Sequence, residues 1–198
     1  MTRERIVNLR DESRVGERVT VAGWVRTFRN DTFIALNDGS CLGTLQLVID
    51  REATPEATRK QITTGAALSA EGVIEASQGR GQAVELKVEV LEVLGGADPE
   101  TYPMQMKKHS LDFLREKAHL RFRTNTFGAV FRVRHALNFA VHRFFTERGF
   151  FQMHTPIITG SDAEGAGEMF RVTTLDADNP PRFDDGSVDL SQDFFGKT

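Results

Sequence analysis

The first fifty residues contain aromatic, amide and guanidinium side chains of the types that hold an unpaired nucleic-acid base. Phe33 offers a ring on which any base can stack, worth about 1–3 kcal/mol, and Gln46 offers an amide that can pair with a base edge. Arg26 and Phe28 lie close by in the chain and add a cation for phosphate and a second ring. These residues could bind single-stranded nucleic acid, provided that the fold places them on one exposed face.

The elements that must position these side chains are strands. From residue 18 to residue 94 apolar and polar residues alternate, and the alternation breaks at turn residues such as Asn30-Asp31 and the NDGS run at 37–40. Because successive strand side chains point to opposite faces, parity sorts them into an inner and an outer set. The expected inner set is Val19, Val21, Val25, Ile34, Leu36, Leu45, Leu47 and Ile49, and the expected outer set is Trp24, Arg26, Phe28, Phe33, Ala35, Asn37, Thr44, Gln46 and Val48.

A short helical stretch from Thr54 to Thr64 separates three strands from two more. This order predicts a five-stranded barrel of the OB-fold type, which commonly binds oligonucleotides. A barrel without a ligand is the alternative. Trp24 is expected to pack as core or as a cap on the barrel, since large aromatic residues are mostly buried, and Phe28 could cover the barrel end.

The composition is that of a globular protein: 198 residues, 39% apolar and 27% charged, which excludes a disordered chain and a collagen-like fibre. Cys41 is the single cysteine and cannot form an internal disulfide. The N-terminus has no apolar core for a signal peptide or a membrane span. We therefore expect a soluble, cytoplasmic protein that does not enter a membrane.

Charge and phenylalanine are unevenly distributed along the chain. Residues 101–149 contain ten basic and three acidic side chains, whereas residues 150–198 contain three and nine. Thirteen of the fifteen phenylalanines lie at or after Phe113. With the glycine-rich run at 95–99 as a break, we expect a barrel domain at 1–97, a basic connector at 98–125 and a differently designed region at 126–198.

The last region begins with a long amphipathic helix. Apolar residues at spacings of three and four predict it from Thr126 to Arg148, with Gly149 as its C-terminal stop. The apolar run from Phe150 to Thr159 is rich in β-forming residues, and Pro156 favours an edge or interface strand. Residues 160–198 have little periodicity, and Asp184, Asp185 and Asp189 are expected in a solvated loop.

Three segments of the first half, GWVRTFRN, TFIALNDGS and LGTLQLVID, resemble the anticodon-binding barrel of the class II tRNA synthetases for aspartate, asparagine and lysine. The second half is more specific: HSLDFLREKAHLRFRTNTFGAVFRVRHAL, ERGFFQMHTPIIT and SDAEGAGEMFRVTTLD are similar to bacterial asparaginyl-tRNA synthetases. The resemblance covers essentially the whole chain. It implies a barrel followed by the start of an α+β class II catalytic domain, an antiparallel sheet with a long motif 1 helix.

The resemblance implies roles for individual residues in tRNA binding. Phe33 would stack on the middle uracil of the anticodon, Gln46 would read that base, and Arg29 would lie near the anticodon loop. Parity places Phe33 and Gln46 on one face but does not select Arg29. Arg26 and Phe28 are further candidates from the outer set.

Beyond the barrel, the resemblance implies a homodimer interface that includes Phe131 and Pro156. A helix buried within its own domain is the alternative. Ser161, Glu164 and Gly165 would belong to a loop that closes over the amino acid, with Glu164 near its α-ammonium; a solvated acidic loop is the alternative. One departure is Phe122, where the family usually has proline, which would loosen the connector's entry to the helix.

The family joins asparagine to its tRNA with ATP and Mg²⁺, using arginines and carboxylates of motifs 2 and 3, which these 198 residues do not contain. No phosphate-binding GxxxxGK loop replaces them, and the five histidines and one cysteine form no catalytic or metal set. We therefore expect tRNA binding but no catalytic residue, no metal site and no tight ATP binding in this chain alone. A stand-alone OB-fold RNA-binding protein and a relative of aspartyl-tRNA synthetases are the alternatives.

Overall fold

The computed structural model describes residues 2–79, 81–159 and 170–194. The chain divides into two compact units, Met1–Val141 and His142–Thr198, and each is described by itself. No helix in the described part of the chain has the length and apolar character needed to cross a membrane. The domain limits expected at residues 97 and 125 both fall within the first of these two units, and they stay a prediction.

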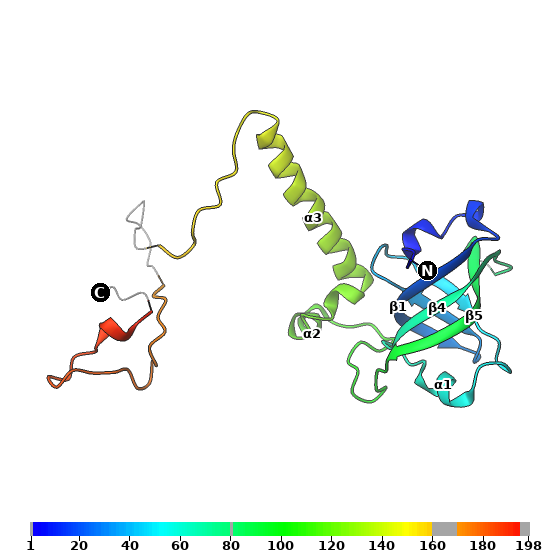
Figure 1. Cartoon of the computed structure of the whole chain (residues 1–198), viewed down its shortest axis with the longest axis horizontal. Coiled ribbons are helices and arrows are strands. Elements are labelled where there is room, and N and C mark those ends of the chain that lie inside the picture. The colour runs from blue at the N-terminus through cyan, green and yellow to red at the C-terminus, as the bar shows by residue number, and fades with distance from the viewer. Residues whose placement is uncertain (1, 80, 160–169, 195–198) are drawn as a thin grey trace. The chain divides into compact units, whose positions relative to one another are not determined.

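The first unit contains a closed five-stranded barrel (Figure 1). Its strands pair in the order β1-β2-β3-β5-β4, with β3 and β5 parallel and the other pairs antiparallel. The predicted order of three strands, a helix and two strands is confirmed, although the helix is shorter than expected. The elements are β1 (Arg18–Arg29), β2 (Phe33–Asn37), β3 (Leu45–Val48), α1 (Glu56–Gln61), β4 (Ala67–Ala76) and β5 (Val84–Gly95).

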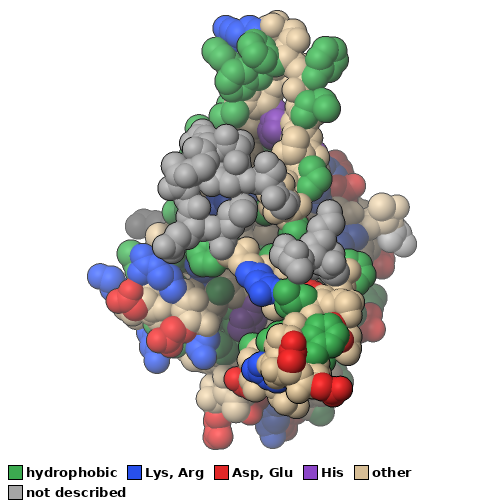
Figure 2. Space-filling view, turned by 90° about the vertical axis from the view of Figure 1, so that its left-hand side faces the viewer, with side chains coloured by type: hydrophobic (Ala, Val, Ile, Leu, Met, Phe, Trp, Pro, Cys, Tyr) green, Lys and Arg blue, Asp and Glu red, His purple; other side chains and the backbone are tan. Residues whose placement is uncertain are grey.

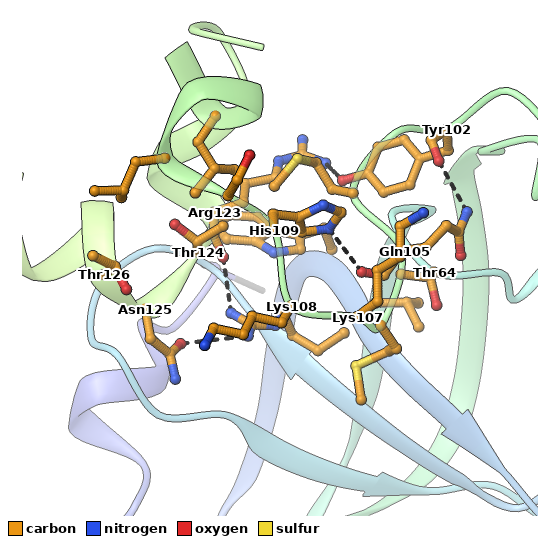
Figure 3. Close-up of a pocket in the computed structure, with 18 residues that line it drawn as sticks. Thr64, Tyr102, Gln105, Lys107, Lys108, His109, Arg123, Thr124, Asn125 and Thr126 are labelled. Carbon is orange, nitrogen blue, oxygen red and sulfur yellow. Dashed lines mark hydrogen bonds between the residues drawn. The ribbon is translucent and has the colours of Figure 1, made fainter. Parts of the chain in front are cut away.

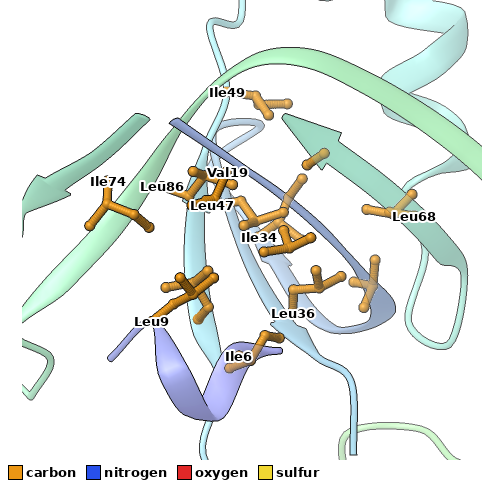
Figure 4. Packing of buried hydrophobic residues seen from close by; sticks show 14 of the residues in the cluster. Ile6, Leu9, Val19, Ile34, Leu36, Leu47, Ile49, Leu68, Ile74 and Leu86 are labelled. Carbon is orange, nitrogen blue, oxygen red and sulfur yellow. The ribbon is translucent and has the colours of Figure 1, made fainter. Parts of the chain in front are cut away.

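The barrel interior is filled by the side chains that parity assigned to it. All eight residues of the expected inner set are buried. Burying one such side chain stabilises the fold by about 1.5–3 kcal/mol relative to leaving it exposed. Ile6 and Leu9, from the N-terminal segment around the 3₁₀ turn Ile6–Asn8, also have no exposed surface (Figure 4). The N-terminal segment therefore belongs to the barrel domain and closes part of its core.

One feature of β1 departs from strict alternation. Val25 pairs with Leu36 but Thr27 pairs with Ala35, so Arg26 is an extra residue, a β-bulge. Beyond the bulge Phe28 stands opposite the buried Ile34 and packs against the core. The expectation that Phe28 faces outward is therefore wrong, because one inserted residue reverses parity for the rest of the strand; the alternative that it covers the barrel end fits the structure.

A connector follows the barrel and leads to the long helix. It contains α2 (Leu111–Glu116), whose N-cap Ser110 accepts a hydrogen bond from the Phe113 amide, and a 3₁₀ turn at Arg121–Arg123. The helix α3 (Asn125–Thr146) ends before Gly149, which has φ +82°. The predicted helix is confirmed within two residues at each end. At the top of the view in Figure 2, hydrophobic side chains (green) lie on both sides.

The second unit has little regular structure among its described residues. Phe150 to Thr159 forms no strand, and Phe151 and Ile157 are 91% and 93% exposed. The expected edge strand is therefore wrong for this structure, because a strand needs a hydrogen-bonded neighbour and none of the described residues supplies one. Asp189 is buried and accepts hydrogen bonds from Ser191 and Gln192, so it stabilises a turn instead of being solvated as expected.

Candidate nucleic-acid interface

The turn between β1 and β2 brings Arg29 opposite Phe33. Asn30 and Asp31 have positive φ values of 53° and 54°, a conformation that these residue types tolerate, and the Thr32 amide donates to the Arg29 carbonyl at 3.1 Å. Asp31 is held in turn by an ion pair of 3.1 Å with Arg59 of α1. Because directly paired residues of antiparallel strands share a face, the Arg29 and Phe33 side chains project from the same outer face.

Gln46 lies on this outer face, one strand further on. Phe33 pairs with Val48 and Ala35 pairs with Gln46, so Phe33 and Gln46 are diagonal neighbours, about 7–8 Å apart in such a pairing. Both side chains are partly exposed, whereas the alternating residues Ile34 and Leu47 are completely buried. The parity prediction for Phe33 and Gln46 is confirmed, and we call Arg29, Phe33 and Gln46 the outer patch.

The parallel pairing of β3 with β5 adds Glu85 next to Gln46. The Gln46 amide donates from Nε2 to Glu85 Oε2 at 3.0 Å. The same carboxylate oxygen accepts hydrogen bonds from Ser77 Oγ at 3.1 Å and from Gln82 Nε2 at 3.4 Å. Parity along β5 places Glu85 outside the barrel, but nothing in the sequence shows that β5 pairs with β3, so sequence reasoning missed this contact.

The outer patch combines three kinds of interaction with an unpaired base. A ring supports stacking at about 1–3 kcal/mol, an amide can both donate to and accept from a base edge, and an exposed guanidinium can neutralise phosphate. The bulge makes this combination possible, because without the extra residue at position 26 Arg29 would face the core. Strand parity placed Phe33 and Gln46 together. The structure places Arg29, which only the resemblance had named, opposite Phe33.

Arg26 and Phe28 are not part of the outer patch. Arg26 donates from Nη1 to the Arg123 carbonyl at 2.9 Å and from Nη2 to Asn125 Oδ1 at 3.4 Å, which ties β1 to the connector. Phe28 packs against the barrel core. The Arg123 guanidinium carbon lies over the Trp24 ring, 4.9 Å from the centre of that ring. This contact matches the expectation that Trp24 packs as core or as a cap on the barrel.

A cleft between β1 and the connector is rich in cations (Figure 3). It has a volume of about 690 Å³, and none of its described lining residues is acidic. We call it the connector cleft. Its basic side chains are Arg26, Lys107, Lys108, Arg123 and His109. Both lysines are exposed, so the cleft can attract phosphate groups without discriminating between bases.

The connector is fixed on the barrel by Tyr102. The Arg123 guanidinium donates from Nη1 to the Tyr102 hydroxyl at 3.0 Å. Tyr102 covers Gly65, where an added Cβ would lie within 2.4 Å of the ring, so only glycine permits this approach. Phe122, at the end of the connector, is half exposed.

The remaining predicted site residues lie elsewhere. Phe131 on α3 and Pro156 are exposed. Ser161, Glu164 and Gly165 lie outside the described residues. Across residues 2–79, 81–159 and 170–194 no group of three or more His, Cys, Asp or Glu side chains could hold a metal ion.

Two protein families match this chain. The family described as "OB-fold nucleic acid binding domain" matches residues 19–94, which includes the barrel strands and the outer patch. The family described as "tRNA synthetases class II (D, K and N)" matches residues 110–192, which begin within the connector, just before α2. Together they cover both halves of the chain in the order expected from the sequence.

Curated relatives are similar over nearly the whole chain. The asparagine-tRNA ligase of Cytophaga hutchinsonii is 57% identical over 186 residues, which is 92% of this chain and 40% of the relative. The asparagine-tRNA ligase of Thermosynechococcus vestitus is 55% identical over 98% of this chain and 43% of its own length. The chain therefore spans about two fifths of the length of the curated relatives that it matches.

Solved structures share the fold. The asparaginyl-tRNA synthetase of Pyrococcus horikoshii complexed with asparaginyl-adenylate superposes with a TM-score of 0.73 over 90% of this chain and 41% of that chain, at 23% identity. The asparaginyl-tRNA synthetase of Entamoeba histolytica in complex with asparaginyl-adenylate gives a TM-score of 0.63 over 74% of this chain and 36% of its own, also at 23% identity. At these identities the similarity supports the arrangement of elements alone.

Proposed function

Since the chain belongs, as an N-terminal portion, to the asparaginyl-tRNA synthetase family, we propose that its barrel binds the anticodon loop of the tRNA for asparagine. The observation that carries this proposal is the outer patch, where a ring, an amide and a guanidinium stand side by side on an OB-fold face. The activity proposed for the complete enzyme is ATP-dependent attachment of asparagine to that tRNA in the cytoplasm.

Anticodon binding at the outer patch would proceed by insertion of one unpaired base. The base stacks on Phe33, its Watson–Crick edge faces the Gln46 amide, and Arg29 lies at the strand end where the neighbouring phosphate passes. Such a site selects the middle uracil of the anticodon. Because asparagine and aspartate anticodons share that uracil, the amino acid must be chosen in the catalytic domain.

We assign a second, base-independent contribution to the connector cleft. The cations Lys107 and Lys108 would lie along the tRNA backbone, and Arg26 and Arg123 would remain engaged in holding the connector. Phosphate contacts add affinity and set the orientation of the RNA but carry no sequence information. Affinity at this cleft should therefore depend on salt concentration.

We propose ATP and Mg²⁺ as cofactors of the complete enzyme. Because the sequence contains neither motif 2 nor motif 3, we propose that the 198-residue polypeptide does not form an adenylate by itself. Ser161, Glu164 and Gly165 remain proposed contacts for asparagine in the complete enzyme.

The exposed apolar side chains of α3 support a proposed homodimer in the complete enzyme. Val133, Leu137 and Phe139 are all more than half exposed, Phe131 on the same helix is exposed, and so is Pro156, which follows the helix. Exposed apolar surface of this extent marks an association site. Sedimentation of the 198-residue chain over a range of concentrations would test whether it associates on its own.

Two measurements test the proposed function. Binding of the chain to an anticodon stem-loop with a middle uracil is compared with binding to the same hairpin with a middle cytosine, at fixed salt. A clear preference for uracil supports anticodon reading, and equal affinity contradicts it. Asparagine-dependent pyrophosphate exchange is measured on the same polypeptide, where turnover above background would contradict the proposed lack of adenylate formation.

The same measurements address the alternative of a stand-alone RNA-binding protein. The observation that favours this alternative is the closed barrel, which encloses a hydrophobic core of its own. Binding of unrelated single strands as tightly as the anticodon hairpin would favour this second reading.

A further inference from the structure

A second cavity lies where α3 begins beside the barrel. It has a volume of about 430 Å³, and its walls come from β1, the loop that follows β2, the connector and α3. We call it the helix cavity. Pockets for small molecules have volumes of about 300–1,000 Å³ and often form where separate elements meet. The helix cavity therefore has the size and the position of a ligand site.

One face of α3 forms the outer wall of the helix cavity. Gly128, Arg132 and His135 are spaced four and three residues apart, so they lie on the same face of the helix, and all three line the cavity. Arg132 donates from Nη2 to the Gly39 carbonyl at 2.6 Å. A Cβ added at Gly128 would lie 3.0 Å from Leu42 Cδ2, so helix and loop approach each other closely there. These contacts hold the two walls in place.

Basic side chains predominate in the wall of the helix cavity. Asp38 is the one acidic residue in the described lining, and its carboxylate accepts hydrogen bonds from the Ile6 amide and from the Ser40 amide and hydroxyl. A cavity lined mainly by one sign of charge attracts ligands of the opposite sign. We therefore expect an anionic ligand. The basic residues of the wall are Arg26, Arg123, Arg132 and His135.

Arg132 is the cation best placed to bind this anion. Arg26 donates to the Arg123 carbonyl and Arg123 donates to the Tyr102 hydroxyl, so both of these side chains hold the connector. The Arg132 side chain is exposed, and its bond to Gly39 uses one of the five N–H donors of a guanidinium. Arginine commonly binds phosphate through two parallel N–H donors.

The apolar part of the wall favours a flat ring. Phe122 is 50% exposed and Leu42 is 44% exposed, although both line the cavity. A ring stacked on Phe122 would cover apolar surface that the protein leaves exposed. Stacking of a base on an aromatic side chain strengthens binding by about tenfold or more. The ligand that fits this wall has both a ring and an anionic group.

We propose that the helix cavity binds a small molecule that joins one flat ring to one phosphate group, which is the chemistry of a nucleoside monophosphate. The ring stacks on Phe122, and the phosphate binds the Arg132 guanidinium. This inference goes beyond the proposed anticodon binding and does not rest on it, because no residue of the outer patch lines the cavity.

Two natural reporters allow a direct test with AMP as the probe. Trp24 and Cys41 are the single tryptophan and the single cysteine of the chain, and both line the helix cavity. AMP should change the fluorescence of Trp24 and slow the reaction of Cys41 with a thiol reagent, with the same midpoint. Adenosine and inorganic phosphate should each bind at least about tenfold more weakly, because each offers only one of the two contacts.

The two reporters also distinguish the two cavities. Trp24 lines the connector cleft as well, whereas Cys41 lines only the helix cavity. A fluorescence change without protection of Cys41 would place AMP in the connector cleft and would overturn the proposal. Absence of both signals at millimolar AMP would overturn it too.

Arg132→Ala should weaken AMP binding by about tenfold, the value of a hydrogen bond to a charged group, and should spare adenosine, which has no phosphate. Equal losses for AMP and adenosine would mean that Arg132 only holds the cavity together, and the phosphate contact would be overturned. The matched control is Arg134→Ala, which removes the same charge from the same helix, about 200° around its axis and outside the cavity lining. It should bind AMP as the wild-type chain does.

Phe122→Ala should weaken the binding of AMP and of adenosine alike, by about tenfold. Phe122 is half exposed, so the barrel should stay folded, as thermal unfolding can verify. Phe33→Ala is the control, since it removes a partly exposed ring from the outer patch and should leave AMP binding unchanged. Unchanged AMP affinity in folded Phe122→Ala would overturn the proposal.

Discussion

The guanidinium of Arg26 donates a hydrogen bond of 2.9 Å to the backbone carbonyl of Arg123, which joins the bulge of β1 to the connector 97 positions later in the chain. The bulge therefore has two consequences. It turns Arg26 toward the connector, and it reverses the parity of the strand so that Arg29 reaches the outer patch. Because of one extra residue in β1, Arg26 faces the connector and Arg29 faces the proposed base site.

Arg26→Ala should release the connector without impairing base selection. The lost hydrogen bonds to a charged donor are worth about 1.5–3 kcal/mol, so opening of the connector should become at least tenfold more frequent. Limited proteolysis within residues 98–125 measures this, because cleavage follows the population of the open form when opening is fast. A variant that instead loses its preference for the uracil hairpin would place Arg26 in base reading.

Phe33→Ala should weaken binding to the uracil hairpin by about 1–3 kcal/mol, the usual loss of one stacked base. Phe33 is partly exposed and lies outside the core cluster, so the barrel should remain folded, as thermal unfolding can verify. Phe28→Ala is the matched control, since the same ring is removed from a residue that packs against the core. It should lower the unfolding temperature more than Phe33→Ala does. Unchanged affinity in folded Phe33→Ala would contradict the assignment of the outer patch.

Lys107→Ala and Lys108→Ala should weaken binding of both hairpins equally. Each lost phosphate contact should reduce the slope of log affinity against log salt by about 0.7–0.9. Lys60→Ala is the control, because Lys60 lies on α1, outside the connector cleft, and pairs with Glu56 at 2.8 Å. A change in the uracil-to-cytosine ratio in the lysine variants would mean that the connector cleft contacts bases.

Strand parity alone could predict much of the barrel. Buried and partly exposed residues alternate along β2 and β3 as far as Leu36 and Val48, so Phe33 and Gln46 could be placed on the outer face from the sequence. The expectation for Asn37 is wrong, because this residue at the end of β2 is buried and donates to the Cys41 and Gly43 carbonyls. The long helix was equally predictable, since its apolar spacing and the glycine at position 149 are local signals. Local periodicity suffices where no residue is inserted.

Features that depend on pairing between distant segments could not be predicted. The bulge at Arg26 has no glycine or proline to mark it, and parity therefore misplaced Phe28 and gave no reason to choose Arg29. The contact between Gln46 and Glu85 depends on a parallel pairing of strands 39 residues apart. The run from Phe150 to Thr159 has strand-like composition, but a strand also requires a hydrogen-bonding neighbour, which composition does not reveal.

Asp38 should make the attachment of the N-terminal segment dependent on pH. Its carboxylate accepts hydrogen bonds from the Ile6 amide at 3.0 Å and from the Ser40 amide and hydroxyl. Burial acts to raise the pKa of Asp38, but these hydrogen bonds and the charge of Arg3 outweigh it, so the pKa lies below its ordinary value of 3.8. The folded state therefore favours the ionised form of Asp38.

A lowered pKa in the folded state means that Asp38 stabilises the protein above the unfolded pKa, and that this contribution is lost as the pH falls below about 4. Amide hydrogen exchange at Ile6 should accelerate over that range in the wild-type chain. Asp38→Asn should show faster exchange already at neutral pH, because a neutral amide accepts more weakly, and a flatter response to acid. Asp112→Asn, which changes an exposed side chain on α2, should behave as wild type. Parallel acid responses in the wild-type chain and Asp38→Asn would show that another carboxylate holds the N-terminal segment.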